Sequence, residues 1–401
     1  MAAAMELSNY CVLPFNSVSI SATGEIRQCC NAGYTSSNTY VDALDVNGII
    51  NNPFIQDIRE HFQENKKHSQ CDRCWKMEDL GSRSFRHVAN NDKEHGVKRG
   101  IKSTKTVMDF EDLEYIDITL GNKCNLACRM CNWSSSSLLA KQLKELGKHN
   151  GPIDLELNEE SKQKVLELFR KSKNLNSIYM LGGEPLINPF HDEILDLLIE
   201  SGQAKNIGIH YNTNLQVNKI EDYIDKWKHF RTIHIQASID GCDEVYNYIR
   251  WPGNWNKVFK NLLTLVNFGD DEKIKVSIST TIQNTNALNI PKLIERCQSL
   301  EGKAVPFFFI PVVGTCTLDI TPKHIIQQAI DILEAMPARN QIPMQDLLAN
   351  YYDALTKPID IRKVGEYFQE QKMFDEKRGQ NLFETVPYFI ELADEYNIER
   401  W

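Results

Sequence analysis

Between Tyr115 and Val313 the chain alternates short apolar segments with amphipathic ones, and this alternation limits the possible folds more than any other feature. Six segments have the length and composition of strands, at 115–120, 177–181, 206–211, 232–239, 274–282 and 306–313. The segments between them show helical periodicity, at 159–171, 189–200, 219–228, 255–268 and 290–300. Repeated strand–helix units predict a parallel sheet with right-handed crossovers, whose active edge lies at the carboxyl ends of the strands. We therefore predict an α/β fold.

The composition is that of a globular protein. The 401 residues suffice for two or three domains, with 42% hydrophobic and 25% charged residues. The 45 basic and 54 acidic residues give a net charge of −9, which argues against general nucleic-acid binding. The most apolar stretch, 304–313, is too short to cross a bilayer, and the N-terminus lacks the pattern of a signal peptide. We expect a cytoplasmic protein without membrane contact, whose 11 cysteines stay reduced.

Three cysteines follow the first predicted strand directly. Cys124, Cys128 and Cys131 form a Cys-x3-Cys-x2-Cys motif on the loop that leaves this strand. Three thiolates so close in sequence can hold three irons of a cubane and leave the fourth iron open for chemistry. A structural zinc site is the weaker interpretation because it needs a fourth ligand, and the nearest other cysteine is far away. A buried core position is weaker still, since polar residues separate the cysteines.

This motif, with the hydrophobic Met130 directly before its last cysteine, resembles the signature of the radical S-adenosylmethionine superfamily. The resemblance implies a partial (β/α)6 TIM-like barrel in which Cys124, Cys128 and Cys131 hold a [4Fe-4S] cluster. It also implies that S-adenosyl-L-methionine chelates the open iron through its amine and carboxylate. Reductive cleavage would then release a 5′-deoxyadenosyl radical that abstracts hydrogen from a substrate, with an electron from a reductant such as flavodoxin or ferredoxin.

The loop after the second predicted strand reads Gly182, Gly183, Glu184 and Pro185. Glycines let the backbone approach a ligand closely, and Glu184 offers a carboxylate to an ammonium group. Taken alone, this sequence could be a plain turn. In the resembled family the motif at this position receives the amino group of S-adenosylmethionine, so we assign these four residues to cofactor binding.

Further polar residues follow the next three strands, and we predict that they bind the cofactor. They are Asn212, Asn214, Ser238, Asp240, Arg250 and Gln283. The first two resemble the family's Thr-Asn-Gly turn, with Leu215 in place of glycine. Ser238 and Asp240 could bind ribose hydroxyls or order the neighbouring loop. The planar guanidinium of Arg250 matches a position that commonly meets the cofactor carboxylate in the family.

A second set of cysteines lies near the N-terminus. Cys11 is followed by Gly24 after twelve residues, then by Cys29 after four more and by the distant pair Cys71 and Cys74. Four thiolates fully ligate an iron–sulfur cluster or zinc. The spacing resembles the Twitch and SPASM extensions of radical S-adenosylmethionine enzymes, which implies an auxiliary [4Fe-4S] or other iron–sulfur cluster, although here the set precedes the barrel. Either Cys29 or Cys30 could be the ligand, and the glycine spacing favours Cys29.

Cys316 follows the sixth predicted strand, where the radical would form. Its thiol could return a hydrogen atom to a substrate radical or bind a further cluster, against the alternative of a small buried residue. Cys242 has the same interpretations, and Cys297 is predicted to lie buried in a helix. Arg83, Arg86 and His87 could face an anionic substrate or belong to a solvated helix. The aromatic residues after Thr321 are predicted to be core residues of C-terminal helices.

We predict three segments: an auxiliary iron–sulfur domain at 1–105, the partial barrel at 106–320 and a helical C-terminal segment at 321–401. The hypothesis is a radical S-adenosylmethionine enzyme that acts on a peptide or on a small amino-acid-like or sugar-like substrate, by oxidation, cross-linking or epimerisation. One alternative is a radical enzyme that modifies a nucleotide or RNA. The other is a non-enzymatic zinc or iron–sulfur scaffold protein.

Overall fold

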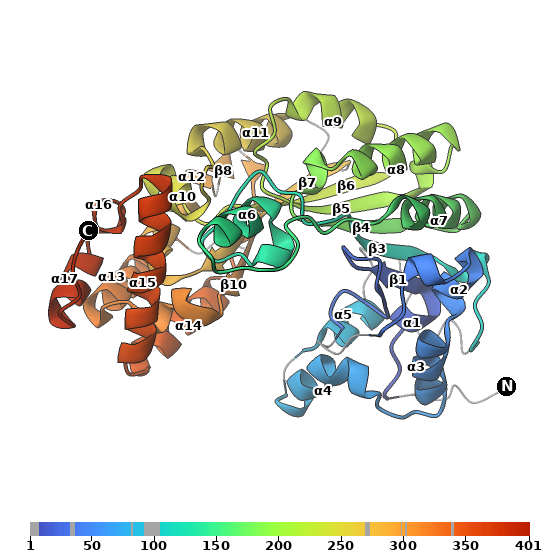
Figure 1. Cartoon of the computed structure of the whole chain (residues 1–401), viewed down its shortest axis with the longest axis horizontal. Coiled ribbons are helices and arrows are strands. Elements are labelled where there is room, and N and C mark those ends of the chain that lie inside the picture. The colour runs from blue at the N-terminus through green and yellow to red at the C-terminus, as the bar shows by residue number, and fades with distance from the viewer. Residues whose placement is uncertain are drawn as a thin grey trace. The chain divides into compact units, whose positions relative to one another are not determined.

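The computed structural model describes residues 8–32, 37–81, 83–91, 105–268, 273–297, 299–300, 303–337 and 341–401. Its main sheet consists of β1 (Ser17–Ile20), β2 (Ile26–Arg27), β3 (Tyr115–Thr119), β4 (Ser177–Leu181), β5 (Gly208–Thr213), β6 (Thr232–Ser238), β7 (Ile274–Ile282) and β10 (Phe307–Pro311). The strand order is β10-β7-β6-β5-β4-β3-β1-β2 (Figure 1). A short hairpin, β8 (Ser299–Leu300) and β9 (Lys303–Ala304), stands apart from this sheet.

All six predicted strands are present, with ends shifted by at most two residues. The pairs β3 with β4, β4 with β5 and β7 with β10 are parallel. From β3 to β10 the strands of the main sheet lie side by side in the order in which they occur along the chain. This is the order of a partial (β/α)6 barrel, so the predicted α/β fold class is confirmed.

The predicted connecting helices are also present: α7 (Glu159–Lys171), α8 (Pro189–Glu200), α9 (Ile220–Trp227), α11 (Trp255–Asn267) and α12 (Asn289–Cys297). An asparagine side chain caps the first turn of three of them, from Asn158, Asn188 and Asn254. The prediction of a helix to residue 300 was wrong at its end. α12 ends at Cys297, because Leu300 pairs with Lys303 in the β8–β9 hairpin.

The chain divides into two compact units. Unit 1 comprises Met1–Cys124, Gly147–Tyr211 and Asp222–His234, and unit 2 comprises Asn125–Leu146, Asn212–Glu221 and Ile235–Trp401. This division passes through the predicted barrel segment at 106–320. The predicted ends of the three segments, at residues 105 and 320, stay a prediction. Each unit is described by itself below.

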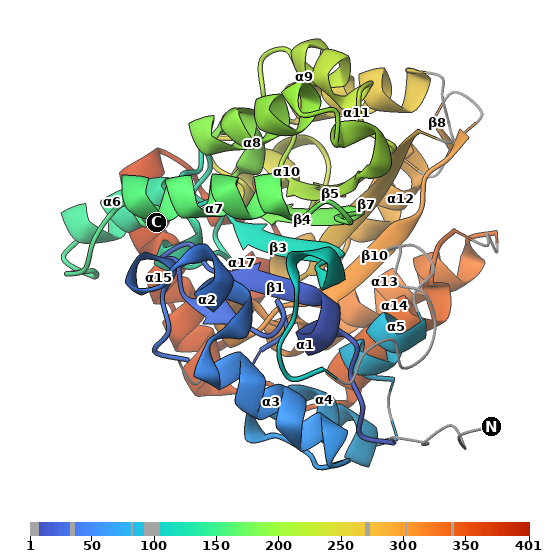
Figure 2. The same ribbon diagram turned by 90° about the vertical axis from the view of Figure 1, so that its right-hand side faces the viewer.

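In unit 1 the N-terminal segment adds two strands that the sequence analysis did not predict. β1 runs parallel to β3 (Figure 2), with Ser17 opposite Tyr115. β2 pairs antiparallel with β1. β1 reads Ser-Val-Ser-Ile and is only four residues long, which is too short a run for alternation to identify a strand with certainty. The short helices of this region are α1 (Leu13–Asn16), α2 (Val46–Asn51), α3 (Pro53–Gln63), α4 (Asp72–Asp79) and α5 (Phe85–Asn91).

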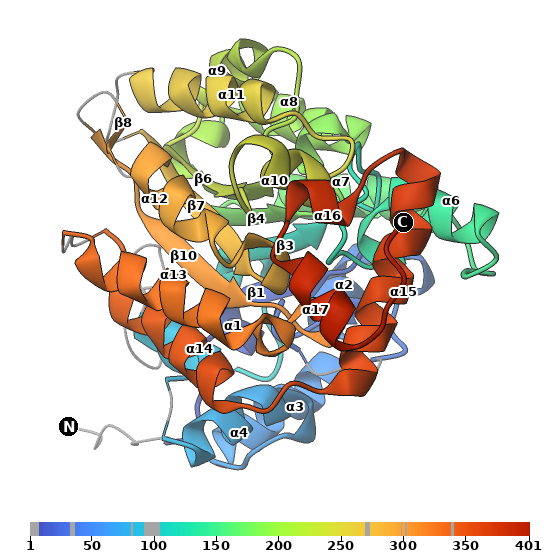
Figure 3. The ribbon, with the colours of Figure 1, turned by 90° about the vertical axis from the view of Figure 1, so that its left-hand side faces the viewer.

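Unit 2 contains α6 (Ser137–Glu145), α10 (Asp243–Ile249) and the C-terminal helices α13 (Lys323–Ala335), α14 (Met344–Thr356), α15 (Ile361–Arg378), α16 (Leu382–Thr385) and α17 (Phe389–Glu395) (Figure 3). Aromatic side chains of the C-terminal helices, including Phe368, Phe383 and Phe389, form one apolar core cluster with Tyr248. The predicted core role of these aromatic residues is confirmed. For Tyr352 on α14 the prediction was wrong, since this residue is 42% exposed and its hydroxyl donates to Glu334 at the surface. Among the described helices, none combines the length and hydropathy that a membrane span requires.

A buried arginine organises the N-terminal part of unit 1. Arg59 on α3 is fully buried and donates hydrogen bonds to the backbone carbonyls of Pro14, Ile50 and Thr106, at 2.6 to 2.8 Å. It also donates to the side-chain oxygen of Asn51 at 3.1 Å. One guanidinium thus holds together three chain segments that are distant in sequence, and a lysine with a single nitrogen could not replace all of these bonds.

We expect Arg59→Lys to lower the free energy of unfolding by about 3 kcal/mol, because several buried acceptors lose their donor. Urea unfolding followed by circular dichroism measures this change. The matched control is Arg362→Lys, whose side chain is 83% exposed and should leave the unfolding midpoint unchanged. Equal midpoints for the two variants would contradict the assigned role of Arg59.

Candidate functional site

The loop that begins the cysteine motif is held by the glycines after β4. The Gly183 amide donates to the carbonyl of Gly121 at 2.9 Å, and the Glu184 amide donates to the carbonyl of Lys123 at 2.8 Å. A Cβ atom on Gly183 would lie 2.4 Å from the carbonyl oxygens of Asn122 and Lys123. Only glycine therefore fits at position 183, and the backbone directly before Cys124 is fixed by the predicted Gly-Gly-Glu-Pro loop.

Glu184 itself is 1% exposed. Its carboxylate accepts a hydrogen bond from the amide of Leu186 at 3.1 Å, at the start of the turn that includes Pro185. A buried carboxylate suits a ligand with a positive charge, since burial makes an uncompensated charge costly. The Glu184 amide bonds the carbonyl of Lys123, the residue directly before Cys124, so this carboxylate belongs to a segment fixed beside the cysteine motif. Its contact with an ammonium group stays a prediction.

The second half of the cysteine motif is fixed by the chain after α10. The amide of Ala127 donates to the carbonyl of Trp251 at 2.6 Å, and the amide of Arg129 donates to the carbonyl of Ile249 at 2.9 Å. Between them, Arg250 places a guanidinium nitrogen 3.9 Å from the sulfur of Cys128. Burial raises the pKa of the Cys128 thiol to about 12, and the charge of Arg250 opposes this shift. The thiol therefore stays protonated at neutral pH unless a metal replaces the proton.

A buried ion pair holds the same loop from the other side. Arg129 lies between Cys128 and Cys131 and bonds Asp375 on α15 at 2.5 Å, with both side chains at most 1% exposed. Its other nitrogens donate to the carbonyl of Tyr248 at 3.0 Å and to Gln371 at 2.6 Å. From sequence, Arg129 was only one of the polar residues that separate the cysteines. No sequence signal identified Asp375, which lies 246 residues further along the chain.

The turn after β5 contacts the cysteine motif through Asn125. The Asn214 side chain donates to Asn125 at 2.9 Å, and Asn125 donates to the carbonyl of Gln216 at 2.9 Å. Leu215 adopts a left-handed φ of 55°, the conformation for which glycine is favoured. The leucine therefore keeps the backbone of the expected Thr-Asn-Gly turn, at a cost in strain that its complete burial offsets.

Several predicted cofactor residues in unit 2 present polar atoms that the protein does not use. In the described part of the chain, Asn212 Oδ1, Arg250 Nε and Gln283 Nε2 are buried without a hydrogen-bond partner. Such atoms indicate a site for a polar ligand. Ser238 is partly exposed at the end of β6.

Asp240 has a different environment. Its carboxylate pairs with Arg250 at 2.7 Å and accepts the Thr281 amide at 2.6 Å, and it is fully buried. The contacts favour the second of its two predicted roles, ordering the neighbouring loop. Asp240 thereby orients Arg250, while the Nε atom of that arginine stays available to a ligand.

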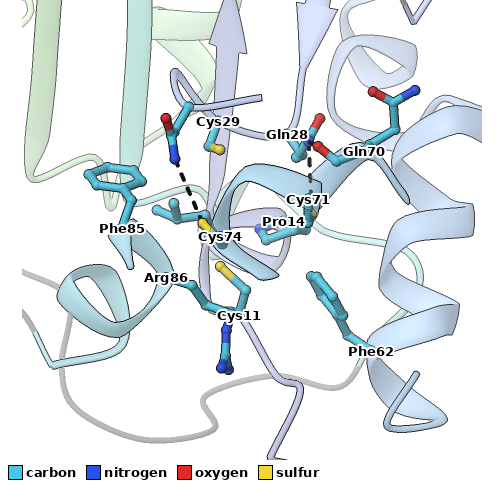
Figure 4. A pocket seen from close by; sticks show the side chains of 12 residues that line it. Cys11, Pro14, Gln28, Cys29, Phe62, Gln70, Cys71, Cys74, Phe85 and Arg86 are labelled. Carbon is cyan, nitrogen blue, oxygen red and sulfur yellow. Dashed lines mark hydrogen bonds between the residues drawn. The ribbon is translucent and has the colours of Figure 1, made fainter. Parts of the chain in front are cut away.

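In unit 1 the four N-terminal cysteines line one cavity of about 20 Å³, together with Gln28, Asn31 and Arg86 (Figure 4). They are Cys11, Cys29, Cys71 and Cys74. Side-chain amides approach two of the sulfurs, from Gln28 to Cys71 at 3.9 Å and from Asn31 to Cys74 at 3.7 Å. The cavity exceeds the space of one water molecule, and amide donors to sulfur are typical of iron–sulfur sites.

The spacing of these sulfur atoms differs from that of a zinc site. Tetrahedral zinc with Zn–S bonds of about 2.3 Å holds its sulfur ligands about 3.8 Å apart. Within the described residues, no three cysteine sulfurs lie within 4.8 Å of one another. A cubane binds each thiolate to a different iron and separates the ligands more widely. The spacing is compatible with the predicted iron–sulfur cluster, and the identity of the metal stays a prediction.

Three other residues of unit 1 do meet the spacing for a single metal ion: Asp57, His61 and His68. The two ring nitrogens of His68 are both engaged by the protein, since Nε2 bonds Asp57 at 2.9 Å and Nδ1 accepts the Gln70 amide at 3.1 Å. A metal-bound imidazole needs a proton on its other nitrogen. That proton would point at the Gln70 amide, so we assign no metal to this group.

Cys30 lies outside the cavity and hydrogen-bonds Asp117 on β3. This arrangement leaves Cys29 as the residue of the doublet that lines the cavity. Asp117 is 1% exposed, and one of its oxygens is without a partner among the described residues. Burial raises the pKa of this carboxyl to about 7, although Cys30 and Ser19 oppose the shift by hydrogen bonding.

The remaining candidates are placed as follows. Cys316 is 4% exposed and packs in the C-terminal core cluster, a position that favours the buried-residue alternative, and Cys242 and Cys297 are fully buried. Arg86 forms an ion pair with Glu78 at 2.6 Å and is 7% exposed. Arg86 is therefore a structural residue, whereas Arg83 is exposed.

Residues 118–297 match the model of the Radical SAM superfamily. A curated relative, the sporulation killing factor maturation protein SkfB of Bacillus subtilis (strain 168), is 25% identical over 181 residues. That alignment covers 45% of this chain, and the chain spans only 38% of the length of the relative.

Matches among solved structures include anSMEcpe with bound AdoMet, at 18% identity and a TM-score of 0.39, covering 55% of this chain and 59% of that one. Streptococcus suis SuiB bound to S-adenosylmethionine matches at 15% identity and a TM-score of 0.37, covering 92% and 73%. SuiB bound to the precursor peptide SuiA matches at 14% identity and a TM-score of 0.35, covering 81% and 70%.

We expect Asp375→Asn to lower the free energy of unfolding by about 3 to 5 kcal/mol, because it leaves the buried charge of Arg129 without its partner. The matched control is Asp353→Asn, which breaks an exposed pair with Lys357 and should cost less than about 1 kcal/mol. Chemical denaturation of both variants measures the difference. Similar small losses would show that the buried pair does not anchor the loop.

The raised pKa of Asp117 predicts a pH dependence. The carboxyl binds its proton more tightly in the folded than in the unfolded chain, so wild-type stability falls as the pH rises from about 4 to about 7. Asp117→Asn removes this titration. The stability of the variant relative to wild type should therefore increase over this range and stay constant above it, as measured by urea unfolding at a series of pH values. A constant difference throughout would refute the shift.

Proposed function

We propose that this protein, whose residues 118–297 match the Radical SAM superfamily model, reductively cleaves S-adenosylmethionine and abstracts hydrogen from a polypeptide substrate. Cys124, Cys128 and Cys131 would hold the [4Fe-4S] cluster. The observation that carries the proposal is the loop of these cysteines, fixed in unit 1 by Gly183 and Glu184 and in unit 2 by residues 249–251.

When bound, the cluster and S-adenosylmethionine supply the electron and the 5′-deoxyadenosyl radical. The chain's own residues bind and orient the cofactor. Glu184 offers a buried carboxylate to its ammonium group, and Arg250 offers Nε to its carboxylate while Asp240 holds the guanidinium in place. Asn212 and Gln283 provide further unused polar atoms for the remainder of the cofactor. Burial of these groups excludes water from the reacting atoms.

The auxiliary site would hold a second cluster through Cys11, Cys29, Cys71 and Cys74. Four thiolates leave no iron open for a substrate, so this cluster would transfer electrons. The amides of Gln28 and Asn31 next to the sulfurs favour the reduced, more negative form of such a cluster. An electron-transfer cluster favours an oxidation or a cross-link, because in these reactions a substrate radical gives up an electron. It is less suited to a reaction without net oxidation.

A polypeptide substrate is favoured by the relative that is named as a maturation protein of a killing factor. The net charge of −9 argues against a large RNA. We also propose a cytoplasmic location. There a flavodoxin or ferredoxin can supply the electron, and the free cysteines stay reduced.

We expect about eight irons per chain after anaerobic reconstitution, from two cubanes. Replacing Cys124, Cys128 and Cys131 by alanine should remove about half of the iron and all 5′-deoxyadenosine formed from S-adenosylmethionine with dithionite. Replacing Cys71 and Cys74 should remove the other half and leave cofactor cleavage measurable. Iron and sulfide analysis with chromatography of the nucleoside gives both results.

Cys242→Ala and Cys297→Ala are the matched controls, since both thiols are buried outside the two sets and should keep the full iron content. Unchanged iron after removal of all three motif cysteines would refute the proposed catalytic cluster. Four irons in wild type, lost with Cys71 and Cys74 alone, would support a scaffold protein instead.

A further inference from the structure

Three buried arginines lie around the second half of the cysteine motif, all within unit 2. Arg129, Arg250 and Arg378 are 4%, 7% and 9% exposed. Arg129 is neutralised by Asp375 and Arg250 by Asp240, each through a direct ion pair. Arg378, near the end of α15, has no ion pair with any residue that the structure describes. One buried positive charge is therefore left without a counter-charge.

The contacts of Arg378 are neutral. Its Nε and Nη2 atoms donate to Gln142 Oε1 at 3.3 and 2.9 Å. The guanidinium lies 4.2 Å from the ring centre of Phe374 and 5.2 Å from that of Trp251. The third nitrogen, Nη1, is buried without a hydrogen-bond partner in the described part of the chain. Aromatic faces and one amide stabilise a cation less than a carboxylate does.

The aromatic residues that hold Arg378 also pack against the cysteine loop. Phe374 and Trp251 belong to one apolar cluster with Ala127 and Cys131. The Cys128 thiol is close enough to act electrostatically on Arg378, and Arg378 acts in turn on Cys128. Asp375 also acts on Arg378, but its oxygens already accept Arg129, the Leu382 amide and Trp401 Nε1.

A buried charge without a partner destabilises a fold. Burial lowers the pKa of Arg378 to about 9, so the side chain stays charged at neutral pH. The missing negative charge can come from the cysteines themselves, because metal-bound thiols are thiolates and thiolate-ligated clusters gain a further negative charge on reduction.

We infer that Arg378 is the counter-charge of the catalytic cluster, a positioning residue on the C-terminal helix that favours the cluster's reduced form. This inference rests on the proposed function, since it requires a cluster on the motif cysteines. Through Arg378, α15 helps to set the reduction potential at which the cofactor is cleaved. This helix lies beyond residues 118–297 of the family match.

The inference makes opposite predictions for the metal-free and the reconstituted protein. Arg378→Met keeps the length of the side chain and removes its charge. In metal-free protein the variant should unfold at the same urea concentration as wild type or a higher one, because an uncompensated charge is gone. In reconstituted protein its catalytic cluster should have a more negative midpoint potential, because the reduced form loses a neighbouring cation. A purely structural role predicts a lower urea midpoint and an unchanged potential.

The potential is measured by a redox titration followed by electron paramagnetic resonance, on the signal that changes when S-adenosylmethionine is added. Arg378→Lys keeps the charge and should have a potential close to that of wild type. Arg362→Met, on the exposed side of the same helix, is the matched control and should change neither the potential nor the urea midpoint.

A wild-type signal that responds to S-adenosylmethionine, with the same midpoint in Arg378→Met, overturns this inference and leaves the proposed function standing. The absence of any such signal in reconstituted wild type overturns the proposed function and this inference with it. A negative shift in Arg378→Met that Arg378→Lys largely restores supports the assignment of Arg378.

Discussion

The buried ion pair of Arg129 with Asp375 is the interaction on which the candidate active site of unit 2 depends. Arg129 lies inside the cysteine motif, and Asp375 lies on a helix near the C-terminus. Asp375 also accepts the amide of Leu382 and the indole nitrogen of Trp401. A loop without regular secondary structure has few hydrogen bonds of its own, so a charged anchor with both partners fully desolvated can decide its conformation.

Burial of the cysteines follows from the same packing. Cys128 is 8% exposed, and its pKa is raised by desolvation. A thiol in such a place is a poor ligand until a metal displaces its proton. The arginines around Cys128 prepare the site for negative charge before any metal binds. Assembly of a negatively charged cluster would thus compensate the buried positive charge of Arg378.

The two sets of cysteines differ in what surrounds them. The N-terminal set has neutral amides from Gln28 and Asn31 at its sulfurs, and Arg86, which also lines that cavity, is neutralised by Glu78. The motif cysteines of unit 2 lie near Arg378, which has no ion pair among the described residues. Neutral donors stabilise a closed cluster without attracting a charged ligand. Arginine near an incompletely ligated cluster can both balance charge and bind the carboxylate of a cofactor. This difference in environment agrees with an electron-transfer role for one set and a catalytic role for the other.

Much of the fold and of the candidate site could be predicted from sequence. The six barrel strands, the connecting helices and the Gly-Gly-Glu-Pro loop were predictable because they depend on local patterns. Strand β1 was missed because it is only four residues long. The end of α12 was missed because the helical spacing of Leu293, Cys297 and Leu300 continues beyond the end of the helix. The left-handed conformation of Leu215 could not be expected from a residue that disfavours it.

By itself, the sequence determined which residues are the candidate iron ligands, since the spacing of Cys124, Cys128 and Cys131 is a local property of the chain. Only the tertiary structure decided which residues hold the cysteine loop in place and which charged groups surround it. Asp375 bonds Arg129 in the cysteine loop, 246 residues away, and Arg378 bonds Gln142 on α6, 236 residues away. No local pattern encodes a contact between such distant segments. The physical reason is that ion pairing and desolvation depend on distance in space, which the fold sets after the sequence has specified its elements.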